Sequence, residues 1–405
     1  MVAYSIPAPW PVPLDRRPED PVAFHKLTEI LSAAVPAAPP IGVPVHRLVE
    51  ELESAEPSGV FGRLLAQLGR DPRLNLFDGK MQVCGNVAVT TNYLGLAVWL
   101  IQRAQRASAS EAVANLTAYV DADEFPCNVV MTLGGMLVRG RHDLGYDIEL
   151  LSWQALPESD DKHETAKYFP GWPGPTAALV WRTRMRRMHV DEKSAGTIPT
   201  FSTQVMDDML LCLGVRGPCA PHTLALWMAP PDSVPMFSRG LMFLGQGGGA
   251  PPRAWYGDPQ DARRLFEMWQ RIDDGRKVAL RMPMQRLNLA IRRLSLADAA
   301  IDLGIALEGL FLRDLGPERG ELGFRLRARA ARFLGEDTDS RRRLERLFKD
   351  LYGCRSTAVH TGLLHGTYHG QDAKALLDSG FRETAAAIVK LIEKGEPDWD
   401  EVLLG

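Results

Sequence analysis

The chain has 405 residues, of which 45% are hydrophobic and 24% are charged, and its formal net charge is -3. This composition is typical of a globular protein and excludes a collagen-like or globally disordered chain. Because the chain as a whole is not a polycation, any surface that binds nucleic acid must be a local patch.

Cysteine usage and the N-terminal sequence indicate the compartment. The five cysteines are few and widely spaced, which argues against a disulfide framework and for a reducing environment. Residues 1–20 are rich in proline, lack the apolar core of a secretory signal and predict an extended arm. The longest apolar stretch, Tyr93–Ile101, is too short to cross a bilayer. We therefore expect a cytoplasmic protein with no membrane partner.

The first half of the chain predicts helices and then a sheet. Apolar residues at helical spacing predict helices over 21–34, 45–52, 60–68 and 93–106, with a proline-rich loop at 35–44. β-Branched and aromatic residues predict strands of an antiparallel or mixed sheet over 116–125, 127–140 and 146–156. Residues 175–190 fit a strand or a helix, and residues 195–256 do not predict an order of elements.

A glycine- and proline-rich stretch at 245–259 predicts a linker. Asp258 and Pro259 then suit the N-cap and first position of a helix. Helices are expected near 259–273, 283–293, 296–314, 321–334, 340–360 and 371–394. The expected architecture is therefore an α+β region over 1–245, a linker over 246–257 and an all-α bundle over 258–405.

One short motif in this bundle carries a candidate chemistry. Arg355 and His360 form an R-x4-H pattern, with the polar Ser356 directly after the arginine. The pattern alone has little specificity, because Arg184 and His189 match it as well. Only Arg355 and His360 end a predicted amphipathic helix, and they follow an "IALE" segment that contains Glu308.

This order of helices resembles the HEPN superfamily, and specifically its Apea-like branch, over roughly residues 280–395. The matching segments are IDLGIALEGLFL, ELGFRLRARAARFLG and FKDLYGCRSTAVHTG. The resemblance implies a HEPN-like helical bundle that is a metal-independent endoribonuclease, acting without a cofactor in antiviral defence or as a toxin. It implies a homodimer in which two R-x4-H motifs share one cleft, with Arg355 and His360 as catalytic residues and Ser356 as the accompanying polar residue.

The chemistry of these side chains is consistent with RNA cleavage. Histidine exchanges protons near neutral pH and can act as base or acid, while arginine stays cationic and forks onto phosphate oxygens. Attack by the 2′-hydroxyl makes RNA the substrate, including transfer RNA or phage RNA. Five residues of an ideal helix turn through about 500°, which leaves Arg355 and His360 about 140° apart. Either the helix is distorted near Gly353, or a second copy completes the site.

Further residues are candidates for binding or positioning. Glu308 would orient Arg355, or lies on a polar face of its helix. Residues 321–360 contain ten basic and six acidic side chains. Arg341, Arg342 and Arg343 stand near a predicted helix N-terminus, where cations oppose the macrodipole. A contact with RNA phosphates would explain this placement, and the alternative is a solvated arginine face. His365 and His369 are expected in a loop among glycines, where His365 would reach the RNA.

Other patterns suggest structure rather than chemistry. Cys212, Cys219 and His222 lack the four ligands of a zinc site, so buried free cysteines are expected. Asp160, Asp161 and Lys162 superficially match a nuclease motif but predict a surface loop. If Arg182, Arg184 and Arg186 belong to a strand, their side chains share one face of it and Arg187 lies on the other face. These arginines would then either contact nucleic acid or protect an exposed strand edge by their charge. No metal site is predicted.

Two alternatives remain open at this point. The bundle could be a catalytically silent HEPN module that binds RNA or a partner protein. The activity could instead reside in residues 1–245, as a metal-dependent nuclease or a small-molecule binder. In the leading interpretation those residues sense a ligand or a regulatory partner protein that restrains the ribonuclease.

Overall fold

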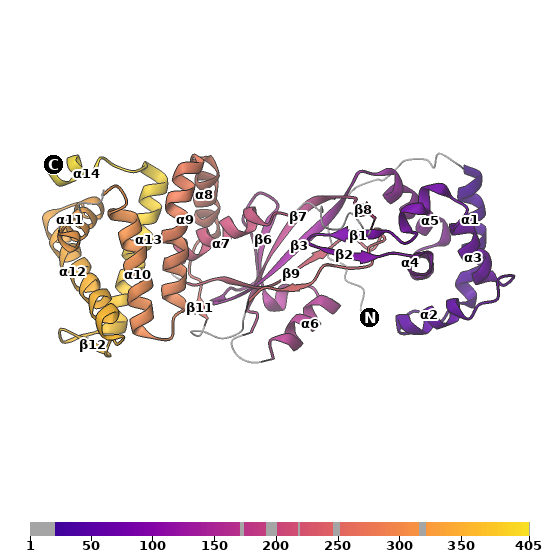
Figure 1. The fold of residues 1–405 in the computed structure, drawn as a ribbon, viewed down its shortest axis with the longest axis horizontal. Helices are drawn as coiled ribbons and strands as arrows, with labels where there is room; N and C mark the ends of the chain where they lie inside the picture. Colours follow the sequence, from indigo (N-terminus) through magenta and orange to yellow (C-terminus); the bar gives the residue numbers. More distant parts are fainter. Residues whose placement is uncertain are drawn as a thin grey trace.

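The computed structural model describes residues 21–170, 174–191, 201–217, 219–245, 252–315 and 321–404. The chain forms an elongated molecule in which an N-terminal group of helices, a central sheet and a C-terminal group of helices follow one another along the longest axis (Figure 1). The expected α+β region followed by a helical region is therefore confirmed. The proposed arm at residues 1–20 lies outside the described residues.

The N-terminal group contains helices and a small three-stranded sheet. Its helices are α1 (Pro21–Ala34), α2 (Val45–Glu53), α3 (Val60–Leu68), α4 (Tyr93–Arg106) and α5 (Ala109–Asp121), with short 3-10 turns η1 (Val35–Ala37) and η2 (Pro72–Phe77). The small antiparallel sheet has the order β2 (Val87–Thr90), β1 (Met81–Cys84), β8 (His189–Val190). The four helices expected here from apolar spacing are confirmed.

The strand expected over residues 116–125 is wrong for most of its length. Residues up to Asp121 complete α5, and the strand begins only at Glu124. The side chain of Ser108 caps α5 by accepting a hydrogen bond from the Glu111 amide. This cap and the burial of Leu116 and Tyr119 on one helix face outweigh the β-propensity of the segment.

The central sheet has six antiparallel strands in the order β10-β9-β3-β7-β6-β5. These are β3 (Glu124–Gly134), β5 (Arg141–Asp143), β6 (Ile148–Ser152), β7 (Ala177–Arg186), β9 (His222–Ala229) and β10 (Met242–Phe243). The longest strand, β3, lies at the centre and is buried at every position after Glu124. Residues 177–186, which fitted a strand or a helix, are a strand.

Helices cover both faces of this sheet. The face containing Val129 and Met131 belongs to a core that also includes α7 (Gln204–Arg216), and the opposite face buries Val130 and Trp227 in a second cluster with η3 (Trp153–Ala155). The surface loop expected at Asp160–Lys162 is wrong, because these residues form the first turn of α6 (Asp160–Tyr168). Asp161 and Lys162 are buried, and Asp161 pairs with Arg239 at 3.1 Å.

The arginine row on β7 lies on one face of the sheet, as the strand alternative predicted. Pairing in register places Arg182, Arg184 and Arg186 opposite alternate residues of β3. Arg182 pairs with Glu149 at 2.7 Å and Arg184 with Glu124 at 3.4 Å. Strand β7 lies between β3 and β6, but β6 pairs only with Ala177–Trp181. Among the described strands, the segment with Arg184 and Arg186 pairs with β3 alone and is therefore an edge, as the charged-edge alternative expected.

The second half of the expected linker is ordered structure. Arg253 and Ala254 form β11, which pairs in parallel with β4 (Met136–Leu137). Trp255 is buried against Gly217, where an added Cβ would lie 1.8 Å from the indole ring. Residues 246–251 lie outside the described part of the chain.

The C-terminal group is helical. It consists of α8 (Pro259–Arg271), α9 (Asp274–Arg292), α10 (Leu296–Phe311), α11 (Leu322–Leu334), α12 (Thr338–Thr361), α13 (Ala373–Lys394) and α14 (Trp399–Leu404), with a short hairpin of β12 (Thr367–Tyr368) and β13 (Gln371–Asp372). Asp258 caps α8 as predicted. The expected start of the second helix at residue 283 is wrong, because α9 begins at Asp274 and contains Pro283. Gly309 of α10 leaves room for the Pro283 ring.

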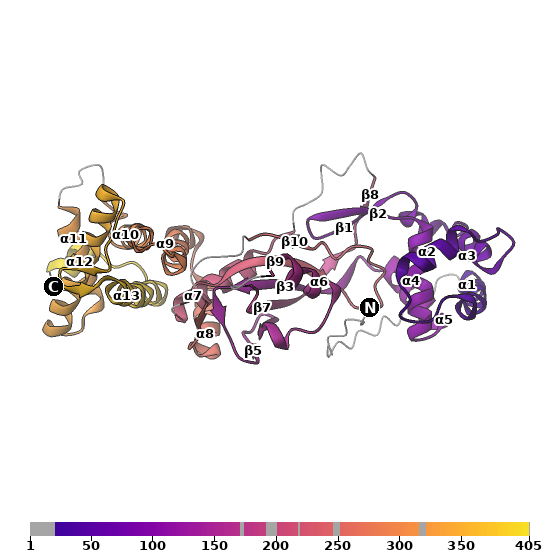
Figure 2. The same ribbon diagram turned by 90° about the horizontal axis from the view of Figure 1, so that it is seen from below.

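Ion pairs join the helical group to the central region. Arg253 of β11 pairs with Asp378 of α13 at 2.9 Å, and Arg281 of α9 pairs with the buried Asp208 of α7 at 2.5 Å. In the view from below, α7 and α8 lie between the sheet and the remaining helices (Figure 2). Among the helices that the structure describes, none combines the length and hydrophobicity of a membrane span.

Candidate functional site

Helix α12 carries the R-x4-H motif, and both of its ends are fixed by local interactions. At its start, the Asp337 carboxylate accepts from the Ser340 amide at 2.7 Å, and the Ser340 hydroxyl accepts from the Asp337 amide at 3.0 Å, which forms a capping box. At its end, Gly362 adopts a left-handed conformation with φ of 71°. The helix continues through Gly353, so a distortion at this residue is not what relates Arg355 to His360.

Arg355 faces α10. Its aliphatic stem lies over Gly304, where an added Cβ would be only 2.4 Å from the arginine Cγ. Its guanidinium pairs with Glu308 at 3.2 Å and lies 5.9 Å from the centre of the Tyr352 ring. The contact with Glu308 is the one expected from the "IALE" segment, whereas the sequence gives no signal for the small residue that Arg355 requires at position 304.

His360 points away from Arg355. It lies in the last turn of α12 and is exposed to solvent. Because the helix is continuous, its geometry keeps the two side chains about 140° apart. Two apolar neighbours are also exposed, Val359 at 48% and Leu363 at 61%. One copy of the chain therefore presents the two halves of the motif on different flanks of one helix.

The other candidates near the motif lie on or beyond the end of α12. Ser356 is half-buried and follows Arg355 on the helix. His365 is exposed in the segment after the C-cap, and His369 occupies the β12–β13 turn with φ of 49°. The expectation that glycines keep these two histidines out of a helix is confirmed.

The β12–β13 hairpin packs against α12 next to the motif. The Tyr368 hydroxyl lies over Gly353, where an added Cβ would be 2.1 Å from that oxygen. The hydroxyl also hydrogen-bonds Thr357, and burial raises the pKa of Tyr368. Gly353 therefore serves as a docking position for the hairpin, a role that the sequence did not indicate.

Replacing Gly353 with alanine should destabilise the protein by about 1–3 kcal/mol, because the new methyl group displaces Tyr368. A gain of roughly 1 kcal/mol in helix propensity opposes this effect but does not cancel it. The additional change Tyr368→Phe removes the clashing oxygen and should restore part of the lost stability. Urea unfolding measures the stability of the wild type, the single variant and the double variant. Gly366→Ala is the control, because an added Cβ at Gly366 would meet open space. A Gly353→Ala variant more stable than the wild type would contradict this packing.

The three arginines near the start of α12 have different surroundings. The Arg341 side chain donates to the Gly335 carbonyl at 3.1 Å and so closes the α11–α12 turn. Arg342 is exposed and 3.7 Å from the exposed carboxylate of Asp339. Arg343 is exposed on another side of the helix. Arg341 thus has a structural contact, while Arg342 and Arg343 are accessible to an anion.

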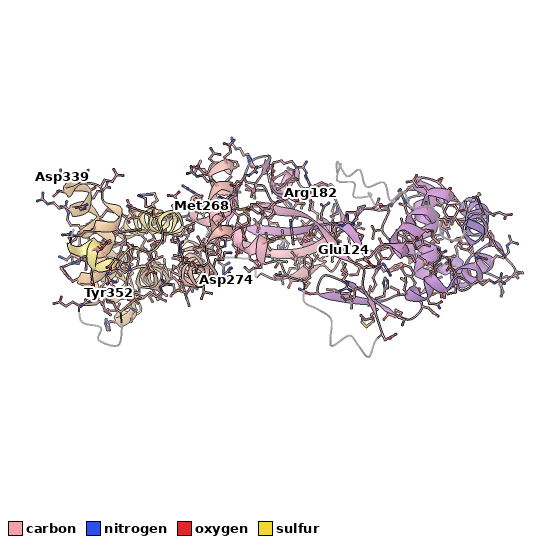
Figure 3. The ribbon with its side chains drawn as sticks, turned by 90° about the horizontal axis from the view of Figure 1, so that it is seen from above. Glu124, Arg182, Met268, Asp274, Asp339 and Tyr352 are labelled. Carbon is pink, nitrogen blue, oxygen red and sulfur yellow. The ribbon has the colours of Figure 1, made fainter. Side chains whose placement is uncertain are left out.

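The second R-x4-H match is part of the sheet region. His189 lies 5.2 Å from the Phe77 ring centre and 6.2 Å from that of Tyr119, and burial lowers its pKa to about 4. Arg184 pairs with Glu124 on the central sheet. Figure 3 shows Glu124 in the central region, far from Tyr352 of α12. This half-buried, neutral histidine packs against aromatic rings, as a structural residue does.

Cysteine and metal chemistry have little support among the described residues. No group of three or more histidine, cysteine, aspartate or glutamate side chains in that part of the chain could hold a metal ion. The five cysteines are free and buried, as expected, and burial raises the pKa of Cys354, next to Arg355, to about 12. A thiol of this kind stays protonated at neutral pH and is a poor nucleophile.

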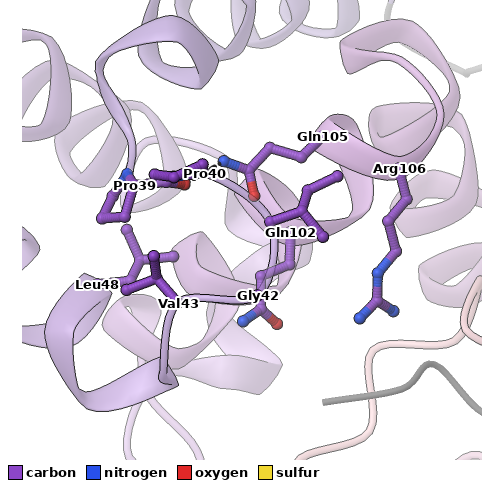
Figure 4. A pocket seen from close by; sticks show the side chains of 9 residues that line it. Pro39, Pro40, Gly42, Val43, Leu48, Gln102, Gln105 and Arg106 are labelled. Carbon is purple, nitrogen blue, oxygen red and sulfur yellow. Dashed lines mark hydrogen bonds between the residues drawn. The ribbon is translucent and has the colours of Figure 1, made fainter.

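One hollow elsewhere is large enough for a small molecule. A cavity of about 640 Å³ lies between the end of α5 and the sheet, and its lining includes Asp121, Asp123, Glu124, Arg184 and Arg186. A second hollow, between the segment after η1 and α4, has only about 30 Å³ (Figure 4). That volume holds about one water molecule. Gln105, which lines it, donates to the Pro39 carbonyl at 2.6 Å.

Comparison with known proteins gives no family for the chain. No protein-family model matches it, and neither the curated proteins nor the solved structures contain a significant match.

Proposed function

We propose that this protein is a metal-independent endoribonuclease of HEPN type, acting on RNA in defence or as a toxin. The observation that carries the proposal is the placement of Arg355 and His360 at the end of one helix. Arg355 is held by Glu308 and His360 is free in solvent. The half-buried arginine is suited to bind an anion in a fixed position, and the exposed histidine is suited to exchange protons with a substrate.

The proposed reaction is an internal transfer within RNA. A 2′-hydroxyl attacks the adjacent phosphorus atom, the bond from phosphorus to the 5′-oxygen breaks, and a 2′,3′-cyclic phosphate forms. One proton leaves the 2′-oxygen and one reaches the departing 5′-oxygen, and His360 takes part in this transfer as base or acid. Arg355 stabilises the charge that develops on the phosphoryl oxygens.

A second copy of the chain completes the proposed site. The two side chains diverge by about 140° on a continuous helix, so they do not meet on one substrate within a single copy. A symmetric dimer can bring Arg355 of one copy beside His360 of the other. Val359 and Leu363, apolar and exposed beside His360, are suited to burial in such an interface.

A silent module is the second candidate. The contact between Arg355 and Glu308 is also one that a purely structural arginine makes between two helices. In that case the helical group binds RNA or a partner protein without cleaving it. For a ribonuclease or a silent module alike, the cavity next to Arg184 and Arg186 in the α+β region could bind a regulatory ligand.

Removing one 2′-hydroxyl from the substrate tests the proposed function, because the proposed reaction requires this group. We expect the protein to cut an unstructured RNA oligonucleotide and to leave untouched the same oligonucleotide carrying a 2′-deoxyribose 5′ to the mapped scissile phosphate. Binding of the two oligonucleotides should be similar, since one oxygen is removed from a long strand. Cleavage of both at the same position would exclude the internal transfer. Binding of both without cleavage of either would favour the silent module.

A further inference from the structure

Three cations stand on the same face of α12 as His360. Arg342, Arg346 and Lys349 follow one another at spacings of four and three residues, and Ser356 and His360 continue the row. At 100° per residue, all of them lie within about 40° of the direction of His360. All except the half-buried Ser356 are exposed. We call these five residues the α12 strip; it is about 27 Å long at 1.5 Å per residue.

Neighbouring elements border the strip without covering its cations. On one side, Tyr352 packs against Gly323 of α11, and Glu345 pairs with Arg327 at 3.0 Å. On the other side, the hairpin docks on α12, and Gln371 donates to Asp350 at 3.4 Å. The acids on both flanks therefore already have partners. The strip lies between α11 and the hairpin, and the hairpin narrows it between Lys349 and Ser356, because Tyr368 lies over Gly353, which points within about 20° of His360.

The cations of the strip are largely without counter-charges. Within the residues that the structure describes, Arg346 and Lys349 make no ion pair, and Arg342 has only the loose contact with Asp339 at 3.7 Å. Arg342 also lies near the N-terminal end of α12, where a cation opposes the helix dipole. Exposed like charges in a row repel one another unless an anion is bound. The arrangement therefore favours a long, negatively charged ligand.

We propose that the α12 strip binds the sugar–phosphate backbone of single-stranded RNA and leads it to His360. This inference rests on the proposed function and adds the path of the substrate. RNA fits the strip better than a protein surface, because the strip has no apolar centre and contains Lys349, and protein interfaces are depleted in lysine. Single-stranded nucleic acids are characteristically bound in positively charged grooves that follow the backbone.

The test compares two triple variants of equal charge change. The strip variant carries Arg342→Gln, Arg346→Gln and Lys349→Gln. The control variant carries Arg47→Gln, Arg63→Gln and Arg70→Gln, which removes three exposed cations from the N-terminal group at the other end of the molecule. Glutamine keeps a helix propensity close to that of arginine and lysine, and circular dichroism checks that both variants fold.

Fluorescence anisotropy with a labelled 20-nucleotide oligouridylate measures binding across a salt series in EDTA. We expect the strip variant to bind at least tenfold more weakly than the wild type, and its slope of log affinity against log salt to fall by about 2, since each lost phosphate contact removes roughly 0.7. The control variant should keep the affinity of the wild type within about threefold.

Three outcomes would overturn the strip as an RNA path. These are a strip variant with wild-type affinity and salt slope, a wild type that does not bind the oligonucleotide, and equal binding of polyglutamate of the same charge. Cleavage, measured on the same samples, separates this inference from the proposed function. Binding through the strip without cleavage by the wild type would refute the function alone, and unchanged cleavage by a strip variant that still binds RNA would refute the strip alone.

Discussion

Replacing His360 with alanine should lower the rate of RNA cleavage by at least about 100-fold, because the group that exchanges protons with the substrate is lost. Little effect on folding is expected, since the side chain is exposed at the end of α12. The measurement is the initial rate of cleavage of a labelled RNA in EDTA, at equal protein concentration and with melting curves for both proteins.

His46→Ala provides a matched control, because His46 is also an exposed histidine on a helix but lies in the N-terminal group. This variant should cleave as fast as the wild type. Equal rates for the wild type and the His360→Ala variant would rule out His360 as the proton-transfer residue. The active residues would then lie elsewhere, and sensitivity to EDTA would point to a metal-dependent nuclease in the α+β region.

Mixing two inactive variants should restore activity if the site is shared between copies. A dimer of Arg355→Gln chains has no arginine in its cleft, and a dimer of His360→Ala chains has no histidine. A mixed dimer has one of each. After subunit exchange in a 1:1 mixture, we expect a rate at least tenfold above that of either variant alone.

The readout is the same cleavage assay, before and after exchange, with sedimentation analysis to show that dimers form. A double variant carrying Arg355→Gln and His360→Ala, mixed with the His360→Ala variant, is the control and should stay inactive, because no His360 is present. A mixture of the two single variants that never exceeds their average rate, despite exchange, would mean that each copy builds its own site.

The helical half of the molecule follows closely from its sequence. Apolar residues at helical spacing and the cap at Asp258 predict α8, α10, α11, α12 and α13 to within a few residues. The exception is α9, where Pro283 suggests a helix start. The proline is tolerated inside the helix because Gly309 of α10 leaves space for its ring, and this long-range contact has no local signal.

The α+β half is harder to predict, because tertiary burial decides between local preferences. Residues 116–121 contain tyrosine and valine and resemble a strand, yet they finish a helix that begins with a cap at Ser108. Arg253 and Trp255 stand in a sequence typical of a linker, yet β4 and Gly217 provide partners for them. Partners of this kind become apparent only when distant segments are brought together.

In the candidate site too, the sequence predicts the residues of the motif but not the residues that pack against them. The sequence supplies Arg355, Ser356, His360 and the partner Glu308 through the order of motif-bearing helices. It does not supply Gly304 under the arginine stem or Tyr368 over Gly353, because both depend on how neighbouring elements pack. The sequence also singles out Arg341–Arg343 by their place near a predicted helix N-terminus. The helical phase of His360 instead selects Arg342 together with Arg346 and Lys349.

The most direct test of the ribonuclease assignment is the chemical nature of the product ends. Purified protein would be incubated with transfer RNA and total RNA in EDTA, and the fragments would be analysed by mass spectrometry. We expect cleavage without metal ions and fragments that end in 2′,3′-cyclic phosphate. Fragments with 5′-phosphate and free 3′-hydroxyl ends, or cleavage that disappears in EDTA, would contradict it.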